Sequence, residues 1–204
     1  MIRSEPNVPA YLETERIRLR KFAEADAGWL ADLHGDPAVM RHIDDGRPAP
    51  RVVTVGQRLP GILREYEELP AGLGCFAAIE KTDGASLGWF SLRPASSVGL
   101  TGGMELGYRL FPAAWGAGYA TEGARAMVRK AITELGVERV VATTMTVNVA
   151  SWRVMEKAGL SRVRIFFAEW PEYLDGAEHG DVEYAVTAEA WLRQESWITP
   201  DSAT

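Results

Sequence analysis

The stretch that decides the fold is residues 104–135, MELGYRLFPAAWGAGYATEGARAMVRKAITEL. Residues 105–110 are predicted to form a strand, which Pro112 ends because proline lacks the N–H that strand pairing needs. The helix that follows is predicted to start near Thr121, a good N-cap residue type, and to end before Gly136. Apolar residues recur within it at three- and four-residue steps, as one buried helix face requires.

A loop with two glycines joins this strand to this helix and reads Trp115-Gly116-Ala117-Gly118-Tyr119-Ala120. The first backbone N–H groups of a helix have no internal partner, and the helix dipole places positive potential there. Glycines lack a Cβ and let a phosphate approach the backbone closely. We therefore expect a phosphate-bearing ligand over residues 116–121, although a tight turn without a ligand fits the glycine pattern equally well.

Composition bounds the class of protein. The 204 residues suit one domain, and 47% hydrophobic with 25% charged residues is ordinary for a soluble globular protein. The net charge of −6 argues against a general nucleic-acid surface and suits a cationic substrate better. We expect no nucleic-acid partner and no membrane partner, because no apolar run is long enough to span a bilayer.

Cysteine and histidine usage gives two further expectations. The single cysteine, Cys75, excludes an internal disulfide and, with no signal-peptide pattern at the N-terminus, favours a cytoplasmic location. Cys75 is predicted to be a buried free thiol because it lies in an apolar strand. The histidines His34, His42 and His179 lack the spacing of metal ligands, so we expect no metal site.

One domain is expected over residues 12–193, with loose termini at 1–11 and 194–204. Further strands are predicted at 12–20, 74–80, 87–93, 138–147, 162–168 and from Val182; further helices are predicted at 25–34, from Pro37, at 53–69 with a break at Pro60-Gly61, at 152–158 and at 188–194. Asp26 is a candidate N-cap, and Arg16, Arg18 and Arg20 are predicted to form a solvated strand face. The strand at 138–147 is expected to lie parallel to 105–110, because a helix joins them.

Three motifs in this order, ELGYRL (105–110), WGAGYATEGA (115–124) and NVASWRVMEKAGL (148–160), resemble the GNAT superfamily of acyl-CoA-dependent N-acetyltransferases. The match looks closest to its Rim-type branch, which acetylates protein N-terminal alanine. Trp115 stands where the wider superfamily has Arg or Gln, and in this it is similar to the Rim-type branch. The resemblance implies an α/β (α+β) fold with a mixed, mostly antiparallel central sheet flanked by helices.

The resemblance also implies a cosubstrate, acetyl-CoA, and the residues that hold it. The pyrophosphate would lie on the backbone of residues 115–121. Splaying of strand 138–147 from strand 105–110 would expose backbone groups of Leu110 and Phe111 to the pantetheine amides. Asn148 would hydrogen-bond the pantetheine arm, although an asparagine at this turn also fits a plain helix cap.

The implied reaction is attack of a neutral amine on the thioester, which a base assists at pH 7. Glu105 is the first candidate for that base; a structural or solvated glutamate is the alternative. The rival carboxylates lie in the acidic loop 169–181: Glu169, Glu172, Asp175, Glu178 and Asp181. Ser151 matches the serine that Rim-type enzymes place near the CoA sulfur, where it would stabilise or protonate the departing thiolate. It could instead be only an N-cap.

Position 155 bears on the thiolate as well. Many GNAT members place a tyrosine there, and Met155 cannot donate a proton. The acceptor is expected to be a protein N-terminus, with small amines such as aminoglycosides, polyamines or amino acids as the alternative. Whether the protein forms a homodimer stays open.

Two other classes fit the sequence less well. A dinucleotide-binding oxidoreductase would need a third glycine where Thr121 stands, and an acidic residue where Asn148 stands. A CoA-binding regulatory module without catalysis would not need Glu105 or Ser151. The sequence therefore favours an N-acetyltransferase.

Overall fold

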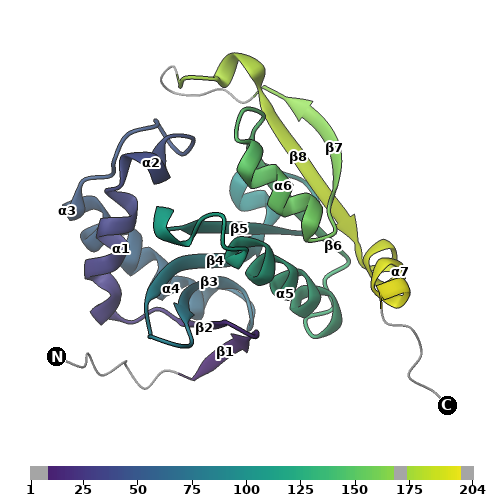
Figure 1. Cartoon of the computed structure of the whole chain (residues 1–204), viewed down its shortest axis with the longest axis horizontal. Helices are drawn as coiled ribbons and strands as arrows, with labels where there is room; N and C mark the ends of the chain where they lie inside the picture. The colour runs from purple at the N-terminus through teal and green to yellow at the C-terminus, as the bar shows by residue number, and fades with distance from the viewer. Residues whose placement is uncertain (1–8, 168–173, 199–204) are drawn as a thin grey trace.

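The computed structural model describes residues 9–167 and 174–198 and shows one mixed sheet flanked by helices (Figure 1). The strand order is β1-β2-β3-β4-β5-β6-β8-β7, and all neighbouring pairs are antiparallel except the parallel pair β5 and β6. This confirms the predicted fold class, including the parallel placement of the two strands that a helix joins.

The elements have the following bounds. The strands are β1 (Ala10–Glu13), β2 (Ile17–Lys21), β3 (Gly74–Glu80), β4 (Ser86–Pro94), β5 (Met104–Leu110), β6 (Arg139–Met145), β7 (Ser161–Phe166) and β8 (Asp181–Thr187). The α-helices are α1 (Ala27–His34), α2 (Pro37–Met40), α3 (Arg51–Val53), α4 (Leu59–Glu68), α5 (Tyr119–Thr133), α6 (Val149–Lys157) and α7 (Ala188–Ile198). No helix within the described ranges is both long and apolar enough to cross a membrane.

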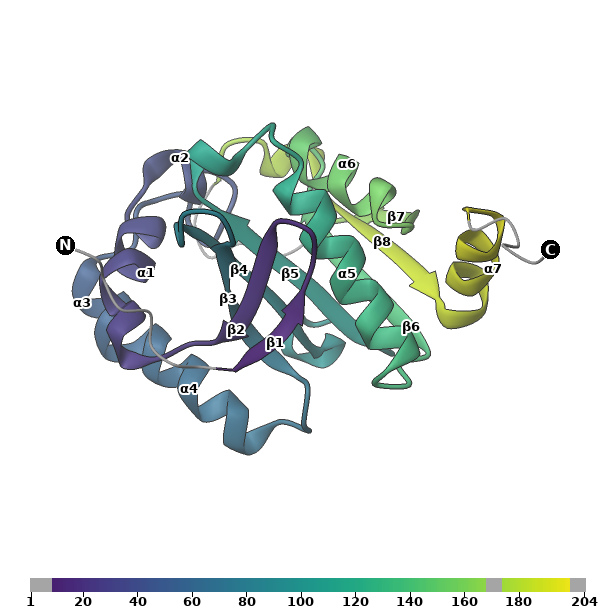
Figure 2. The same ribbon diagram turned by 60° about the horizontal axis from the view of Figure 1, so that its bottom comes forward.

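Helices cover both faces of the sheet, and the alternation of β3 shows how. Phe76 and Ala78 point into a core shared with α5, whereas Cys75, Ala77 and Ile79 point into a second core shared with α1 and α4. Figure 2 shows α5 lying across one face of the sheet, with α1, α3 and α4 gathered on the other side. Successive residues of β3 therefore face alternately into the core beneath α5 and into the core beneath α1 and α4.

The N-terminal strand prediction was wrong in detail. Instead of one strand at 12–20, β1 and β2 form an antiparallel hairpin, closed by a hydrogen bond from the Thr14 N–H to the Ile17 carbonyl at 2.9 Å. The segment expected to be loose up to residue 11 already contains β1, whose Tyr11 ring stacks on Phe76 with centroids 3.6 Å apart. Helix α7 likewise extends to Ile198, beyond the expected limit at 193.

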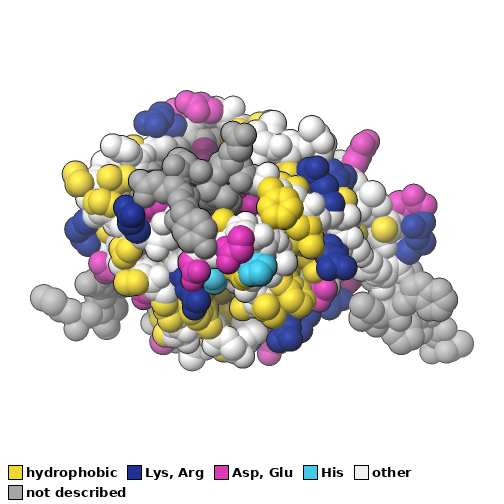
Figure 3. All heavy atoms as spheres, turned by 90° about the horizontal axis from the view of Figure 1, so that it is seen from above, with side chains coloured by type: hydrophobic (Ala, Val, Ile, Leu, Met, Phe, Trp, Pro, Cys, Tyr) yellow, Lys and Arg dark blue, Asp and Glu magenta, His cyan; other side chains and the backbone are white. Residues whose placement is uncertain are grey.

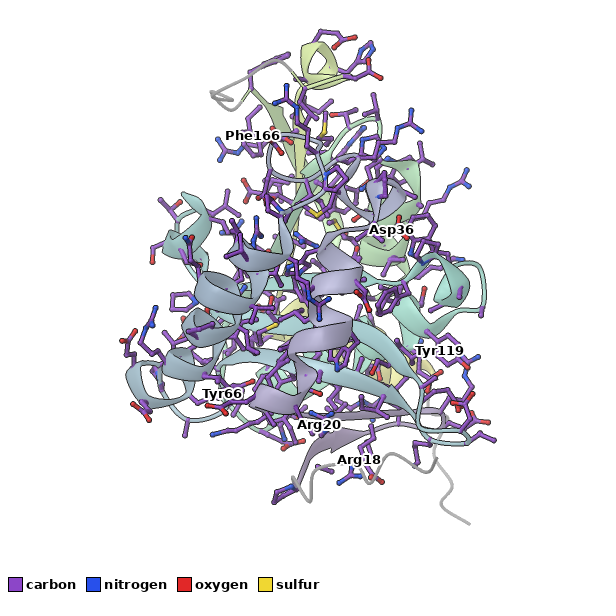
Figure 4. The ribbon with its side chains drawn as sticks, turned by 90° about the vertical axis from the view of Figure 1, so that its left-hand side faces the viewer. Arg18, Arg20, Asp36, Tyr66, Tyr119 and Phe166 are labelled. Atoms are coloured by element: carbon purple, nitrogen blue, oxygen red, sulfur yellow. The ribbon has the colours of Figure 1, made fainter. Side chains whose placement is uncertain are left out.

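The prediction that Arg20 lies on a solvated face of its strand was wrong. Its side chain is only 3% exposed and points towards α1, as Figure 4 shows from that side of the molecule. Both Nη atoms donate to the Asp26 carboxylate, at 2.7 and 2.8 Å. Asp26 is thus an ion-pair partner, and it makes no side-chain cap bond to α1.

Two helix boundaries also differ from the predictions. Helix α5 starts at Tyr119 with Gly118 as its N-cap, two residues before the predicted start at Thr121. The irregularity in the 53–69 segment is a π-helical stretch over Thr54–Arg58, ahead of the predicted break at Pro60-Gly61. Pro60 is the second residue of α4 and follows directly after this π-helical stretch, so the helix continues through the proline.

The pairing along β5 is unequal on its two sides. On one side β5 pairs with β4 over seven residue pairs, from Gly88 with Leu110 to Pro94 with Met104. On the other side it pairs with β6 only at Met104 with Val140 and Glu105 with Val141. The two strands therefore part beyond Glu105, which is the predicted splay and leaves one edge of β5 open.

Candidate active site

The glycine loop places an unused set of backbone donors at the start of α5. Gly116 and Gly118 have φ values of 72° and 85°, a region that residues with a side chain rarely adopt. The first helical amide with a backbone acceptor is that of Glu122, which donates to the Gly118 carbonyl at 3.0 Å. Within the described chain, the amides of residues 116–121 donate to no protein group, so they can bind an anion.

The β1–β2 hairpin holds this loop in place through Glu122. The Glu122 carboxylate accepts hydrogen bonds from Thr14 Oγ1 at 2.5 Å, from the Arg16 N–H at 2.9 Å and from Arg16 Nε at 2.7 Å. Arg16 Nη1 donates to the Ala117 carbonyl at 2.9 Å, and its guanidinium lies 4.4 Å from the centre of the Tyr119 ring. Burial opposes ionisation of Glu122, but these hydrogen bonds outweigh it and lower the Glu122 pKa.

A cavity of about 540 Å³ lies between this loop, α6 and the segment 38–43 around the end of α2. Figure 3 views the molecule from above, where hydrophobic and basic side chains lie around a histidine and a few acidic groups. The predicted site residues that line the cavity are Leu110, Trp115, Gly116, Gly118, Ala120, Thr121, Asn148 and Ser151. The cavity thus brings together most of the predicted CoA-binding residues, while Glu105, Phe111, Ala117 and Tyr119 are not part of its lining.

The charged residues that line the cavity are all basic. Four of its lining residues are arginine or lysine, namely Arg41, Arg109, Arg153 and Lys157, and none of its described lining residues is acidic. This positive lining contrasts with the net charge of −6 of the whole chain. The cavity therefore suits an anionic ligand.

The start of α6 builds one wall of the cavity. Asn148 is the N-cap of α6: its Oδ1 accepts from the Ser151 N–H at 3.3 Å, and its Nδ2 donates to Thr144 Oγ1 at 3.1 Å. Ser151 is therefore inside the helix, and the alternative that it serves as an N-cap is wrong. Its Oγ lies 3.1 Å from Tyr108 Oη, which also donates to the Ser151 carbonyl at 2.8 Å.

The backbone at the end of β5 differs in part from the prediction. The Phe111 N–H donates to the Leu87 carbonyl at 2.9 Å, so it is not exposed to a ligand. Because successive residues of a strand point their backbone groups to opposite neighbours, those of Leu110 point towards the splay. The Leu110 carbonyl accepts a hydrogen bond from Trp115 Nε1 at 2.9 Å. Trp115 thus fastens the loop to the strand.

Glu105 lies where β5 and β6 part, as the last residue of β5 that pairs with β6. Burial raises the pKa of its carboxyl to about 7, and the opposing charge of Arg93, its cross-strand neighbour on β4, only partly offsets this rise. A Cβ on Gly107 would lie 3.4 and 3.5 Å from the two carboxylate oxygens and 2.5 Å from Ser91 Oγ. The space that a side chain at Gly107 would need is thus already filled by Ser91 Oγ and by the Glu105 carboxylate, which can take up a proton near neutral pH.

The sequence analysis assigned no role to two residues of the ELGYRL motif that line the cavity. Tyr108 is on the α5 side of β5, and burial raises its pKa, so its hydroxyl stays protonated. Arg109 is on the opposite face with Glu105 and Gly107, and its guanidinium lies 5.2 Å from the centre of the Trp89 ring. The period-2 alternation of a strand could have separated these two environments, but the sequence does not show which residues α6 and α2 bring near them.

The acidic-loop residues divide by position. Glu169 and Glu172 lie outside the described residues. Asp175 and Glu178 are exposed, and Asp181 is a buried residue at the start of β8.

Within the part of the chain that the structure covers, no cluster of three or more His, Cys, Asp or Glu side chains could hold a metal ion. Cys75 is a buried free thiol, as predicted, and burial raises its pKa.

Comparison with known proteins identifies the family. The model of the family described as "Acetyltransferase (GNAT) domain" matches residues 16–161, and the chain belongs to this family. The chain is 35% identical over 189 residues to the FsC-acetyl coenzyme A-N(2)-transacetylase of Aspergillus fumigatus, covering 90% of this chain and 79% of that protein. It is therefore an acetyl-CoA-dependent N-acetyltransferase.

Solved structures agree with this fold. An acetyltransferase of the GNAT family from Bacillus anthracis aligns with a TM-score of 0.70 at 23% identity, over 89% of this chain and 98% of that one. RimL, the ribosomal L7/L12 alpha-N-protein acetyltransferase in complex with coenzyme A, aligns with a TM-score of 0.71 at 17% identity, over 89% of this chain and 99% of that one. At these identities the likeness establishes the fold alone, and the Rim-type branch remains a prediction.

Proposed function

We propose that this enzyme transfers the acetyl group of acetyl-CoA directly to a primary amine, with both substrates bound at the splay between β5 and β6. The free amides of residues 116–121 hold the CoA pyrophosphate, and the pantetheine arm runs along the open edge of β5 towards Glu105. Arg153 and Lys157 on α6 add positive charge to the cavity on the CoA side. Asn148 positions Ser151 and thereby shapes the wall beside the pantetheine.

The observation that carries the proposal is the raised pKa of Glu105, about 7, at the point where the strands part. A base with a pKa near the working pH combines adequate ionisation with adequate proton affinity. Glu105 would accept the proton of the attacking amine. Because Glu105 does not line the cavity, the proton would reach its carboxylate through an intervening water molecule.

Departure of the CoA thiolate needs a proton or a hydrogen bond from the other face of β5. Tyr108 and Ser151 present two hydroxyl groups 3.1 Å apart at the cavity wall. The raised pKa of Tyr108 keeps its proton on the hydroxyl at neutral pH. We assign stabilisation of the thiolate to this pair, with Ser151 as the contacting group and Tyr108 as its hydrogen-bond partner.

Two kinds of acceptor are candidates. A protein N-terminus is the acceptor that the Rim-type motifs favour, since an α-amine, with a pKa of about 8, loses its proton more readily than a lysine. A small amine is favoured by the relative whose name gives FsC as the molecule acetylated at N(2). The site accommodates either reaction, because both begin with a neutral amine and the same thioester.

An acetyl-transfer screen tests the proposal. Purified protein and acetyl-CoA are incubated with N-terminal peptides and with small amines, and both free CoA and acetylated product are measured. Glu105→Gln should lower turnover while CoA affinity is kept, and Glu67→Gln, on the exposed side of α4, serves as the matched control. CoA binding without transfer to any amine would make the chain a CoA-binding module, and unchanged turnover in Glu105→Gln would move the base elsewhere.

A further inference from the structure

Arg109 stands out among the cations of this protein that are withdrawn from bulk water. Of three such arginines on the strands, Arg20 is buried, and Arg93 and Arg109 are partly buried. Arg20 binds Asp26 at 2.7 Å, and Arg93 lies 2.9 Å from Glu65. Within the described residues, no carboxylate lies within 4 Å of the Arg109 guanidinium. Among the residues that the structure describes, Arg109 is thus a partly buried cation without a carboxylate partner.

The contacts that Arg109 does make are weak. Its Nη1 donates to the Met40 sulfur at 3.3 Å, a poor acceptor, and its Nε has no hydrogen-bond partner in the described part of the structure. The nearest carboxylate that affects it electrostatically is Asp44, which is already paired with Arg58 at 2.5 Å. Leaving a buried charge unpaired is costly, so an arrangement of this kind is expected where a ligand supplies the missing partner.

The position of Arg109 separates it from the CoA phosphates. It lines the same cavity as the glycine loop, but its side chain extends from the face of β5 that is turned towards α1 and α4. Tyr108, Ser151 and the free amides of residues 116–121 lie on the opposite face. On the Arg109 side the cavity is bounded by residues 38–43, which include Arg41 and His42 and no carboxylate. An anion bound there would belong to the acceptor.

We propose that Arg109 binds an anionic group of the acceptor, so that the substrate is an amine that also carries a carboxylate. The inference rests on the proposed function and adds a specificity-determining residue to it. Nε and the adjacent Nη of a guanidinium can donate two parallel hydrogen bonds to one planar carboxylate. The amine of the same molecule would then lie along β5 towards Glu105, four residues away on the same face. The positive lining of the cavity favours this acceptor over a purely cationic polyamine.

The test uses acceptors that differ only in charge. Acetyl transfer is measured with glycine, 4-aminobutyrate and 6-aminohexanoate, each against its own carboxamide, with kcat/KM determined from CoA release and product formation. At least one acid should exceed its amide by about tenfold to a hundredfold, the range expected for a hydrogen-bonded charge pair. The length of the preferred acid measures the distance between the reacting amine and Arg109. Equal rates for every acid and its amide overturn the proposal.

Substitutions of Arg109 test whether this residue causes the preference for acids over amides. Arg109→Gln should abolish the preference for the acid over its amide, mainly through a higher KM for the acid. Arg109→Lys should keep part of the preference, because it retains the charge without the two-point geometry. The control is Arg51→Gln, an exposed arginine outside the cavity.

Three results would count against the assignment. If the preference for the acid persists in Arg109→Gln, or if Arg109→Gln lowers kcat/KM equally for acids and amides, Arg109 is not the anion-binding residue. If Arg109→Gln does not fold, the Arg109→Lys variant decides: a full preference with a point charge overturns the two-point role. Absence of transfer to any amine contradicts the proposed function itself, an outcome separate from equal transfer to acids and amides.

Discussion

The positive charges of Arg20, which is buried, and of Arg109, which is partly buried, are matched in different ways. Arg20, on β2, has its charge matched by Asp26, whose carboxylate also accepts hydrogen bonds from the Ala23 N–H at 2.8 Å and from Trp29 Nε1 at 2.9 Å. Arg109, on β5, has only the Met40 sulfur and the face of the Trp89 ring. We call the Arg20–Asp26 group a closed network, because a protein carboxylate matches the cation. We call the surroundings of Arg109 an open network, because no described carboxylate does so.

Several polar atoms near β5 lack a hydrogen-bond partner within the described structure. Around β5, the atoms Ser91 Oγ, Glu65 Oε2 and Arg109 Nε are buried and have no hydrogen-bond partner among the described residues. The same strand carries Glu105, whose pKa burial raises to about 7. Unpaired polar groups are destabilising, so an Arg109 Nε without a partner beside the cavity is consistent with a site that substrates complete.

The largest expected effect on stability is in the closed network. Asp26→Asn would leave Arg20 buried and unpaired, which is expected to cost about 3–5 kcal/mol of the free energy of unfolding. Urea unfolding at pH 7 measures it, with Asp32→Asn, part of an exposed pair with Arg51, as a control expected to cost less than about 1 kcal/mol. A loss as small as that of the control would mean that the Arg20 pair contributes little.

The same carboxylate predicts a pH dependence of stability. Burial alone would raise the pKa of Asp26, but hydrogen bonds from Arg20, the Ala23 N–H and Trp29 outweigh it and lower the pKa. A lowered folded-state pKa gives stability that is present above the ordinary aspartate pKa and is lost as the pH falls through the folded-state value. The acid unfolding of Asp26→Asn should therefore be shallower than that of the unaltered protein.

The largest expected effect on rate is in the open network. Glu105→Gln should lower kcat by about a hundredfold to ten-thousandfold, the usual contribution of a general base, without weakening CoA binding. Because Glu105 must be ionised to accept a proton and its pKa is about 7, kcat should rise as the pH increases through 7. Steady-state kinetics between pH 5.5 and 9 would show this rise, and its persistence in Glu105→Gln would assign it to the amine substrate instead.

A smaller effect is expected at the glycine loop. Gly118→Ala forces a residue with a Cβ to adopt a φ of 85°, which is expected to cost about 1–2 kcal/mol and to displace the amides that face the CoA pyrophosphate. Thermal unfolding and CoA titration measure the two consequences. Gly56→Ala, where a Cβ meets no atom within 4 Å and φ is not positive, is the matched control. Unchanged CoA affinity in Gly118→Ala would argue against the pyrophosphate position.

The smallest effect on stability is expected where the network is open. Arg109→Met removes a partly buried cation that has no carboxylate partner among the described residues, so the free energy of unfolding should stay within about 1 kcal/mol or increase. Urea unfolding of Arg109→Met beside Arg20→Met compares the two arginines directly, since Arg20→Met leaves Asp26 buried and unpaired. Equal losses in the two variants would contradict the distinction between a closed and an open network.

Local sequence signals were enough to predict the elements from β3 to α7, the parallel unit around α5 and the family. These follow from local signals: apolar periodicity, proline and glycine at element ends, and three motifs on successive elements. The loop 115–121 was predicted this way, whereas the splay between the strands at 105–110 and 138–147 was implied only by the family resemblance. The β1–β2 hairpin was missed, because a three-residue turn between two short strands leaves the alternating pattern almost unbroken.

Only the tertiary structure decided what surrounds each polar side chain. Arg20 and Arg109 are both arginines in strands, yet one faces Asp26 on a neighbouring element and the other faces a cavity. Likewise, Tyr108 meets Ser151 across 43 residues of sequence, and the pKa of Glu105 depends on burial by distant segments. Periodicity fixes which face of a strand a side chain occupies, but charge pairing and desolvation depend on distances between segments far apart in the sequence, and packing sets those distances.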